Sequence, residues 1–266
     1  MNKINHAIHE IHTMADLANK DQWVNRIHPL VKLVLTVFYI AIVVSCPNRA
    51  VFLLLGFVIY PIAMFVISEL SFKDALYRLR IVLPVVCLIG IFNPVFDRTP
   101  VLVIGRITLT NGWLSFFSLL LKGIFTVLAS YLLIATTSIE KICYALRLIH
   151  VPSIIVTQIM LTYRYLTVLL REASTITAAY SLRAPGQKGV HYKVWGSLLG
   201  QLLLRTMDRA TTLYESMCLR GFHGDFPIPE QKKCGADSYF HLIFWCVLFV
   251  VFRKFPILSM IGGIFL

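Results

Sequence analysis

Two arginines stand where predicted helices end, in the most polar part of the chain. Arg220 closes the amphipathic run that begins at Leu202, and Gly221 follows it. Arg183 is followed closely by Pro185-Gly186. A cation favours a helix C-terminus by roughly 0.3–1 kcal/mol and glycine is the usual terminator, so helix capping alone accounts for both positions. The arginine fork also grips a carboxylate bidentately. Because the pattern occurs twice, we predict docking on two equivalent acidic grooves, as on a dimer.

The composition of the chain indicates an integral membrane protein. Of its 266 residues, 58% are hydrophobic and only 14% are charged, with a mean hydropathy of +0.75. A soluble domain carries about 25% charged residues. The formal charge of +12 needs no nucleic-acid partner, since Lys and Arg gather in cytoplasmic loops and near anionic lipid headgroups. The six cysteines lack metal-ligand or redox-motif spacing, so we expect free thiols.

Apolar runs of about 20 residues mark the expected membrane spans. The alternating stretch around Gly105 predicts a small hairpin between the third and fourth spans. The apolar tail 255–266 continues the last span, lies on the surface or turns back, and the sequence leaves these three options open. The expected spans are Leu30–Cys46, Ala50–Ser68, Ile81–Phe96, Trp113–Thr136 and Tyr239–Phe252.

These spans suggest four regions and one orientation. Basic residues are concentrated in the N-terminal segment, in the second loop with Lys73, Arg78 and Arg80, and in the long polar segment. The positive-inside rule places all three in the cytoplasm. The expected regions are an N-terminal segment (1–28), a transmembrane bundle (29–137), a cytoplasmic domain (138–237) and a C-terminal transmembrane segment (238–266).

Three amphipathic helices are predicted in the polar segment, from apolar residues at helical spacing. They cover Ile139–Ile149, Ile154–Leu182 and Trp195–Met217. We expect one face of each to pack on the bundle or the inner membrane surface, while the other faces water or a partner. Their charged residues would be costly in the hydrocarbon core: Arg164, Arg171, Glu172, Arg205, Asp208 and Arg209.

The sequence offers little catalytic or ligand-binding chemistry. It has no phosphate-binding G-x-x-x-x-G-K-[ST] loop. The expected spans contain no Asp or Glu, and their one His is His241 near the start of the last span, which disfavours an ion-coupled carrier or an intramembrane protease. Apart from Lys32 at the start of the first span, Lys122 is the one Lys or Arg in an expected span, and we favour snorkelling to the interface over a position facing the bundle interior. His6, His9 and His12 are weak metal candidates with Glu10 or Asp16; otherwise they are surface residues of a helix lying on the membrane.

Several stretches resemble a known family, the transmembrane T component of energy-coupling factor transporters, in its cobalt/nickel branch, CbiQ. The resemblance covers nearly the whole chain and is strongest in two neighbouring stretches of the polar segment. Those two are Leu204-Arg205-Thr206-Met207-Asp208-Arg209-Ala210 and Ser216-Met217-Cys218-Leu219-Arg220-Gly221-Phe222. Weaker support comes from His28-Pro29-Leu30-Val31-Lys32-Leu33, Ala145-Leu146-Arg147, Val151-Pro152, Tyr163-Arg164-Tyr165 and Arg171-Glu172-Ala173.

The resemblance implies an all-α polytopic bundle with a coupling domain, in a bacterial or archaeal plasma membrane. The coupling domain would dock on a dimer of ABC-type ATPases. The chain would also serve a membrane substrate-binding subunit for cobalt or nickel. ATP and Mg²⁺ would bind the ATPases, and this chain would bind no cofactor and catalyse nothing. Arg183 and Arg220 match the arginines of two Ala-Arg-Gly-type signatures. The neighbouring residues would complete the docking ends: Leu182, Leu219, Ala184 and Gly221. Leu182 and Leu219 stand where the signature has alanine, and Ala184 stands where it has glycine.

Five further residues would support the coupling helices, namely Arg164, Arg205, Asp208, Arg209 and Glu215. The nearest alternative keeps this architecture and serves a vitamin-binding subunit instead. A stand-alone channel or carrier is a more distant alternative, and an intramembrane enzyme is disfavoured by the missing catalytic residues.

Overall fold

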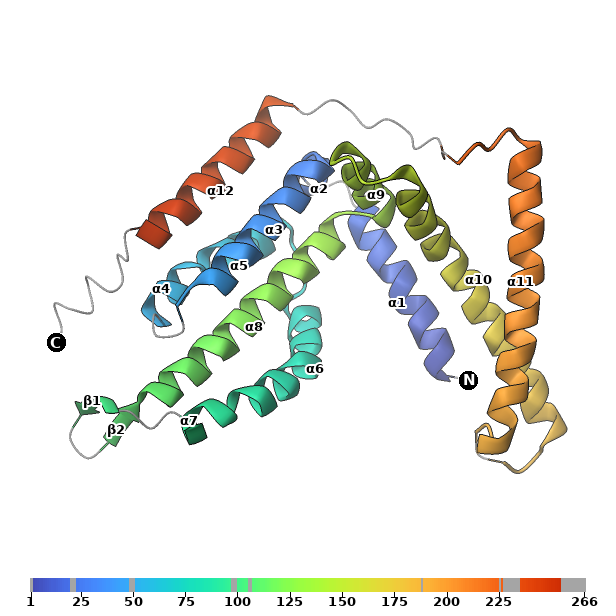
Figure 1. Ribbon diagram of the computed structural model, residues 1–266, viewed down its shortest axis with the longest axis horizontal. Coiled ribbons are helices and arrows are strands. Elements are labelled where there is room, and N and C mark those ends of the chain that lie inside the picture. The colour runs from blue at the N-terminus through green and yellow to red at the C-terminus, as the bar shows by residue number, and fades with distance from the viewer. Residues whose placement is uncertain are drawn as a thin grey trace. The chain divides into compact units, whose positions relative to one another are not determined.

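The computed structural model describes residues 2–19, 23–47, 51–96, 100–104, 107–187, 189–224, 226 and 235–254, and its ribbon is drawn in Figure 1. The chain folds as two compact units. Unit 1 contains residues 1–17 and 138–231, and unit 2 contains residues 18–137 and 232–266. Residues 138–231 therefore form a continuous segment that leaves unit 2 and returns to it.

Unit 2 is a helical bundle arranged around one long helix, α8 (Asn111–Thr136). Helix α8 packs against α3, α4, α5, α6 and α7, and α12 packs against α3 and α4. The other elements of unit 2 are α2 (Trp23–Arg26), α3 (Pro29–Ser45), α4 (Val51–Gly56), α5 (Ile59–Ile67), α6 (Phe72–Gly90), α7 (Phe92–Phe96), β1 (Pro100–Ile104), β2 (Ile107–Thr110) and α12 (Ala236–Lys254).

The predicted hairpin is confirmed. Strands β1 and β2 pair antiparallel, with Leu102 opposite Leu109 and Ile104 opposite Ile107. Gly105, on which the prediction centred, lies outside the described residues.

Close approach of α6 and α8 depends on two glycines. A Cβ added to Gly123 would lie 3.1 Å from a methyl group of Val86, and one added to Gly90 would lie 2.8 Å from the ring of Phe116. Small residues let helix backbones approach in this way, which is the usual packing device between apolar helices in membranes.

The expected span Ala50–Ser68 is divided into α4 and α5, joined by a tight turn at Phe57 and Val58. The carbonyl of Phe57 would normally accept a hydrogen bond from the residue four positions later, which is Pro61 and has no N–H. The Tyr39 hydroxyl donates to that carbonyl instead, at 3.0 Å. The proline thus explains the break, and the tyrosine compensates for it.

The expected loop before the third span is wrong. Helix α6 begins at Phe72 and so includes the residues between Ser71 and Ile81 that the sequence assigned to a cytoplasmic loop. The apolar residues Ala75 and Leu79 are buried, and the Arg78 guanidinium lies 5.0 Å from the centre of the Tyr131 ring. Arg78 and Arg80 therefore project from a helix with a packed apolar face. The expected span also ends early, because α6 stops at Gly90 and α7 follows.

Unit 1 contains the three helices predicted in the polar segment. They are α9 (Ile139–Leu148), α10 (Ser153–Arg183) and α11 (Trp195–Leu219), and the 3₁₀ turn η1 (Tyr192–Val194) leads into α11. Helix α9 packs on α10, and α10 packs on α11. The N-terminal helix α1 (Asn2–Asn19) starts in this unit.

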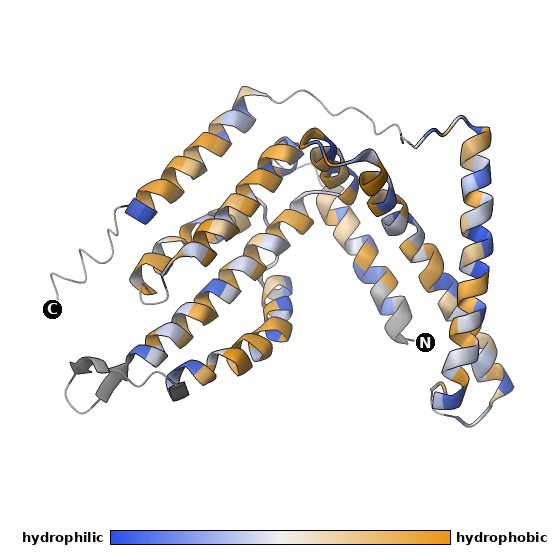
Figure 2. Ribbon diagram, in the orientation of Figure 1, coloured by the Kyte–Doolittle hydropathy of each residue, from blue (hydrophilic) through white to orange (hydrophobic). Residues whose placement is uncertain are grey.

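Four helical regions have the length and hydropathy of membrane spans, namely Asp74–Pro94, α8, α10 and α12. Figure 2 shows the apolar residues that dominate α8 and α12. Helix α3 and the stretch Leu53–Ile67 are apolar but shorter. Helix α10, predicted to be amphipathic, meets these criteria of length and hydropathy because Arg164 is the only charged residue between Ser153 and Leu170. The chain is a multi-pass, all-α membrane protein.

Candidate functional site

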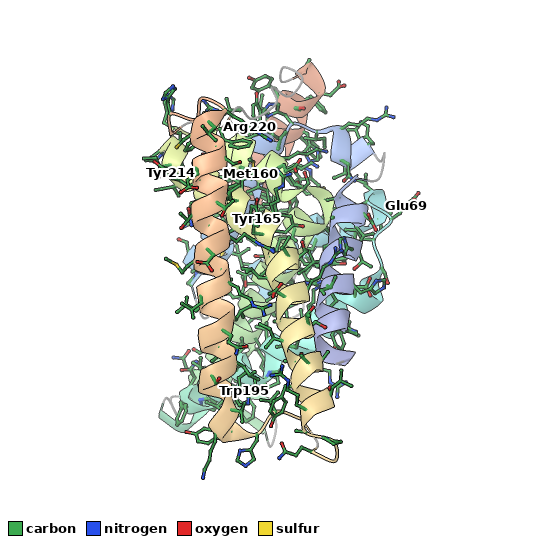
Figure 3. The ribbon with its side chains drawn as sticks, turned by 90° about the vertical axis from the view of Figure 1, so that its right-hand side faces the viewer. Glu69, Met160, Tyr165, Trp195, Tyr214 and Arg220 are labelled. Atoms are coloured by element: carbon green, nitrogen blue, oxygen red, sulfur yellow. The ribbon has the colours of Figure 1, made fainter. Side chains whose placement is uncertain are left out.

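The candidate docking arginines belong to an antiparallel pair of helices, α10 and α11. Arg205 near the middle of α11 forms an ion pair with Glu172 of α10, whereas Arg220 at the end of α11 lines a groove with Leu161 and Arg164, which lie earlier in α10. Figure 3 shows the same order, with Met160, Tyr165 and Arg220 toward one end of the pair and Trp195 at the other. The two helices therefore run in opposite directions.

Helix α11 ends in a Schellman motif. The N–H of Phe222 donates to the carbonyl of Met217 at 3.0 Å, and the N–H of Gly221 donates to the carbonyl of Cys218 at 2.9 Å. Gly221 has a φ of +80°, a conformation that only glycine adopts without steric cost. This motif holds Arg220 at the helix cap, where its side chain is exposed.

A groove extends from Arg220 along the α10–α11 pair, with a volume of about 490 Å³. Its two guanidinium groups, from Arg164 and Arg220, stand among apolar walls, so the groove suits an anionic group on an apolar segment. We call this the Arg220 groove, and its remaining lining residues are Leu161, Tyr165, Leu213, Ser216, Met217, Gly221, Phe222 and Phe226.

The first arginine, Arg183, is the last residue of α10, and its helix ends differently. Ala184 is the cap, with a φ of −123°, and its N–H donates to the carbonyl of Tyr180 at 3.1 Å. Gln187 then turns back to accept a hydrogen bond from the Tyr180 hydroxyl at 2.7 Å. With Ala184 where the signature has glycine, the positive φ is delayed to Gly186, at +98°. The two arginine ends therefore present different backbones.

Both arginines are flanked by unusually exposed leucines. The preceding residues, Leu182 and Leu219, are 83% and 90% exposed. A leucine that is almost wholly exposed buries little of its apolar surface within its own chain, so burying it against a partner would be favourable. Each helix end thus presents a cation next to an apolar side chain.

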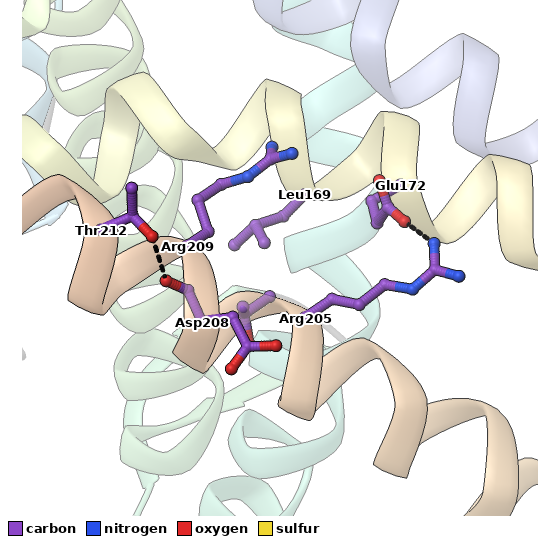
Figure 4. A pocket seen from close by; sticks show the side chains of 7 residues that line it. Leu169, Glu172, Arg205, Asp208, Arg209 and Thr212 are labelled. Carbon is purple, nitrogen blue, oxygen red and sulfur yellow. Dashed lines mark hydrogen bonds and ion pairs between the residues drawn. The ribbon is translucent and has the colours of Figure 1, made fainter.

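A second groove, of about 510 Å³, lies farther along the pair beside the Arg205–Glu172 ion pair (Figure 4). Asp208 and Arg209 line it, and the Thr212 hydroxyl donates to the backbone carbonyl of Asp208 at 2.9 Å. Four of the five expected support residues therefore line one groove or the other. The fifth, Glu215, is exposed on α11 outside both.

Metal-ligand clusters are absent from the part of the chain that the structure describes, where no three His, Cys, Asp or Glu side chains come within reach of one ion. His6, His9 and His12 lie exposed on α1, and the Nδ1 atom of His6 is 3.8 Å from a carboxylate oxygen of Glu10. These three histidines therefore form no cluster of metal ligands among the described residues.

Two lysines are buried among the residues of unit 2 that the structure describes, Lys32 and Lys122. Lys122 is only 8% exposed, and its Nζ donates to the carbonyl oxygens of Cys46 at 2.5 Å and Val44 at 3.3 Å. It faces the bundle interior, so the snorkelling interpretation is wrong. The reason is that the carbonyls at the C-terminal end of α3 offer it hydrogen bonds and a favourable helix dipole.

Lys32 makes the reciprocal contact, from α3 to the C-terminal end of α8, and this contact was not predicted. It is 5% exposed, and its Nζ donates to the carbonyl of Thr136, the last residue of α8, at 2.8 Å. The sequence signal for it was the resemblance in the stretch His28 to Leu33, but nothing there identifies a partner more than a hundred residues later in the chain.

Comparison with known proteins agrees with this architecture. LarQ, a nickel permease of Lactiplantibacillus plantarum, is 27% identical over 122 residues, and the match covers 44% of each chain, so the chain spans less than half of this relative's length. A family described as CbiQ, cobalt transport protein, matches residues 20–233. Because this match runs from the start of unit 2 through the whole α10–α11 pair, the chain belongs to the CbiQ family of cobalt transport proteins.

Proposed function

We propose that the chain is the energy-coupling transmembrane subunit of an ATP-driven importer for cobalt or nickel ions. The observation that carries the proposal is the pair of exposed arginines, Arg183 and Arg220, at opposite ends of an antiparallel helix pair. Partner ATPases would hydrolyse the ATP, and a separate membrane subunit would bind the metal.

The spacing of the arginines suits a dimeric partner. Arg220 lies beside Arg164 of α10, and a rise of 1.5 Å per residue from there to Arg183 gives a separation of roughly 28 Å. Two cations so far apart contact different surfaces, and two equivalent ATPase subunits provide one acidic groove for each. When ATP brings those subunits together, the grooves approach and draw both ends of the helix pair with them.

The comparisons support cobalt or nickel as the substrate. The CbiQ family is described by cobalt transport, and the LarQ relative is named for nickel. In this proposal a separate membrane subunit supplies the metal ligands. Vitamin uptake with no cobalt or nickel uptake would assign the chain to the vitamin branch instead.

The test is affinity purification of the tagged full chain from cells that express its neighbouring transport genes. We expect Arg220→Glu to reduce co-purification of the ATPases strongly, and the Arg183→Glu, Arg220→Glu double variant to abolish it, with the protein still inserted. Arg171→Glu is the matched control, since it makes the same charge change at an exposed position of α10 away from the helix ends. Normal co-purification and normal metal uptake by the double variant would refute the docking role.

A further inference from the structure

The first turn of α3 contacts the chain at the point where it leaves unit 2. Helix α8 ends at Thr136, and unit 1 resumes at Ser138. The Lys32 ammonium donates to the Thr136 carbonyl at 2.8 Å, so a buried charge holds the last residue of α8 before the crossing. No helical N–H follows to satisfy that carbonyl, because the helix stops there.

The same turn also contacts the chain where it returns. Helix α12 starts at Ala236, shortly after residue 231, where the segment in unit 1 ends. The backbone N–H of His28 donates to the hydroxyl of Ser238 at 3.2 Å, and both Ser238 and His241 of α12 are buried. The His241 ring meets the Trp23 ring edge-on, with centroids 5.8 Å apart.

The five residues from His28 to Lys32 therefore contact the chain on both sides of the segment 138–231. Lys32 holds the end that precedes it, and His28 holds the end that follows it. The residues that precede and follow the segment 138–231 are thus both held by the same turn at the start of α3. A pull on either of these two ends would act on the same part of α3.

We propose that the turn His28–Lys32, here called the anchor turn, is the joint through which movement of the arginine-ended helices is delivered to the membrane bundle. Lys32 is its positioning residue, because its charge supplies the contact to the outgoing end. This inference rests on the proposed coupling function, but the anchoring itself is a property of this chain alone.

A purely structural role for Lys32 is the competing explanation, and Lys122 separates the two. Both lysines are buried, and both donate to carbonyls at a helix C-terminus. The contact of Lys122, however, is at Val44 and Cys46, remote in sequence from both ends of the segment. Lys122→Met therefore removes the same kind of contact from the same unit and leaves the anchor turn intact.

The first measurement is backbone hydrogen exchange of the purified chain in lipid nanodiscs. Losing a hydrogen bond from a charged donor should raise local exchange about ten- to hundredfold. We expect Lys32→Met to do so at residues 133–138, Ser238→Ala to raise exchange at residues 236–241, and Lys32→Arg to restore protection. Lys122→Met should leave both stretches near wild type. Equal effects of Lys32→Met and Lys122→Met would overturn the anchor.

The second measurement is metal uptake per ATP hydrolysed by the assembled complex in proteoliposomes. Lys32→Met should lower this ratio while ATP hydrolysis continues, and Lys122→Met should leave it unchanged. An unaltered ratio in Lys32→Met would refute the transmission role. If the wild-type chain shows no ATP-coupled uptake, the proposed function fails, and the exchange experiment still decides whether the anchor exists.

Discussion

Removing the Tyr39 hydroxyl tests the explanation for the break between α4 and α5. Tyr39 is fully buried, and its hydroxyl donates to the carbonyl of Phe57, which is itself buried. The helical donor for that carbonyl is missing because Pro61 has no N–H. Tyr39→Phe keeps the ring and its contacts with Tyr60 and Phe249, whose centroids lie 4.7 and 5.2 Å away, and leaves the carbonyl without this hydroxyl.

A buried polar group that loses its partner costs about 1–3 kcal/mol, so Tyr39→Phe should lower the free energy of unfolding by that amount. Pro61→Ala changes the outcome, because the new N–H stands four residues after Phe57 and can donate to its carbonyl. In the Pro61→Ala background we therefore expect Tyr39→Phe to cost less than about 0.5 kcal/mol, which is an interaction energy of about 1–2 kcal/mol in a double-mutant cycle.

Reversible unfolding in mixed micelles, followed by far-ultraviolet circular dichroism, measures all four proteins of this cycle. Tyr60→Phe is the control for removing a phenolic hydroxyl from the same aromatic group, and its cost should not depend on Pro61. If Tyr39→Phe costs the same with proline and with alanine at position 61, the missing N–H is not the reason for the tyrosine contact.

Two further predictions concern exposed or half-buried contacts. The ion pair between Arg205 and Glu172 is partly exposed, at 58% and 24%, so Arg205→Glu or Glu172→Arg alone should destabilise the α10–α11 contact by only about 0.2–1 kcal/mol. The charge-swapped double variant should recover most of it, as measured by spin-label distances between the helices; no recovery would show that the two charges do not interact. Burial lowers the pKa of His28 from its ordinary value of 6.5, and its Nδ1 accepts from the N–H of Leu30 at 3.3 Å. The unfolded chain therefore binds the proton more readily, and stability should fall as the pH drops below about 6.5. His28→Asn retains a capping oxygen and should flatten this dependence in unfolding measurements, whereas an unchanged slope would assign it to another group.

Periodicity and helix punctuation in the sequence were enough to predict most helices. Pro152 and Gly221 bound the helices of the polar segment, and the apolar runs identified α3, α8 and α12. Helix α6 was mistaken for a loop in its first half, because Lys73, Arg78 and Arg80 outweighed the buried face of Ala75 and Leu79. A charge count does not show on which side of a helix the charges lie.

Tertiary pairings were beyond the sequence. The positions of Arg183 and Arg220 at helix ends were predicted, but no local pattern announces that Arg205 pairs with Glu172 or that Lys32 reaches Thr136. Lys122 shows the same limit: general cost arguments favoured the membrane interface, whereas the carbonyls of Cys46 and Val44 made the interior favourable. Docking on ATPases stays a prediction from the family resemblance.

The reciprocal lysine contacts have a consequence for how the protein is made. The partner of Lys122 lies 76 residues earlier in the chain, and the partner of Lys32 lies 104 residues later. At a synthesis rate of about 5–20 residues per second, α3 waits roughly 5–20 s with Lys32 lacking Thr136 before α8 is complete. Lys122 stands near the centre of α8, where a lysine adds about 2.5–3.5 kcal/mol to insertion from the translocon. The Cys46 carbonyl at the end of α3, to which it donates, is made before α8. Biogenesis should therefore retain α3 beside the insertion machinery until α8 arrives, and the two helices should enter the lipid as a pair.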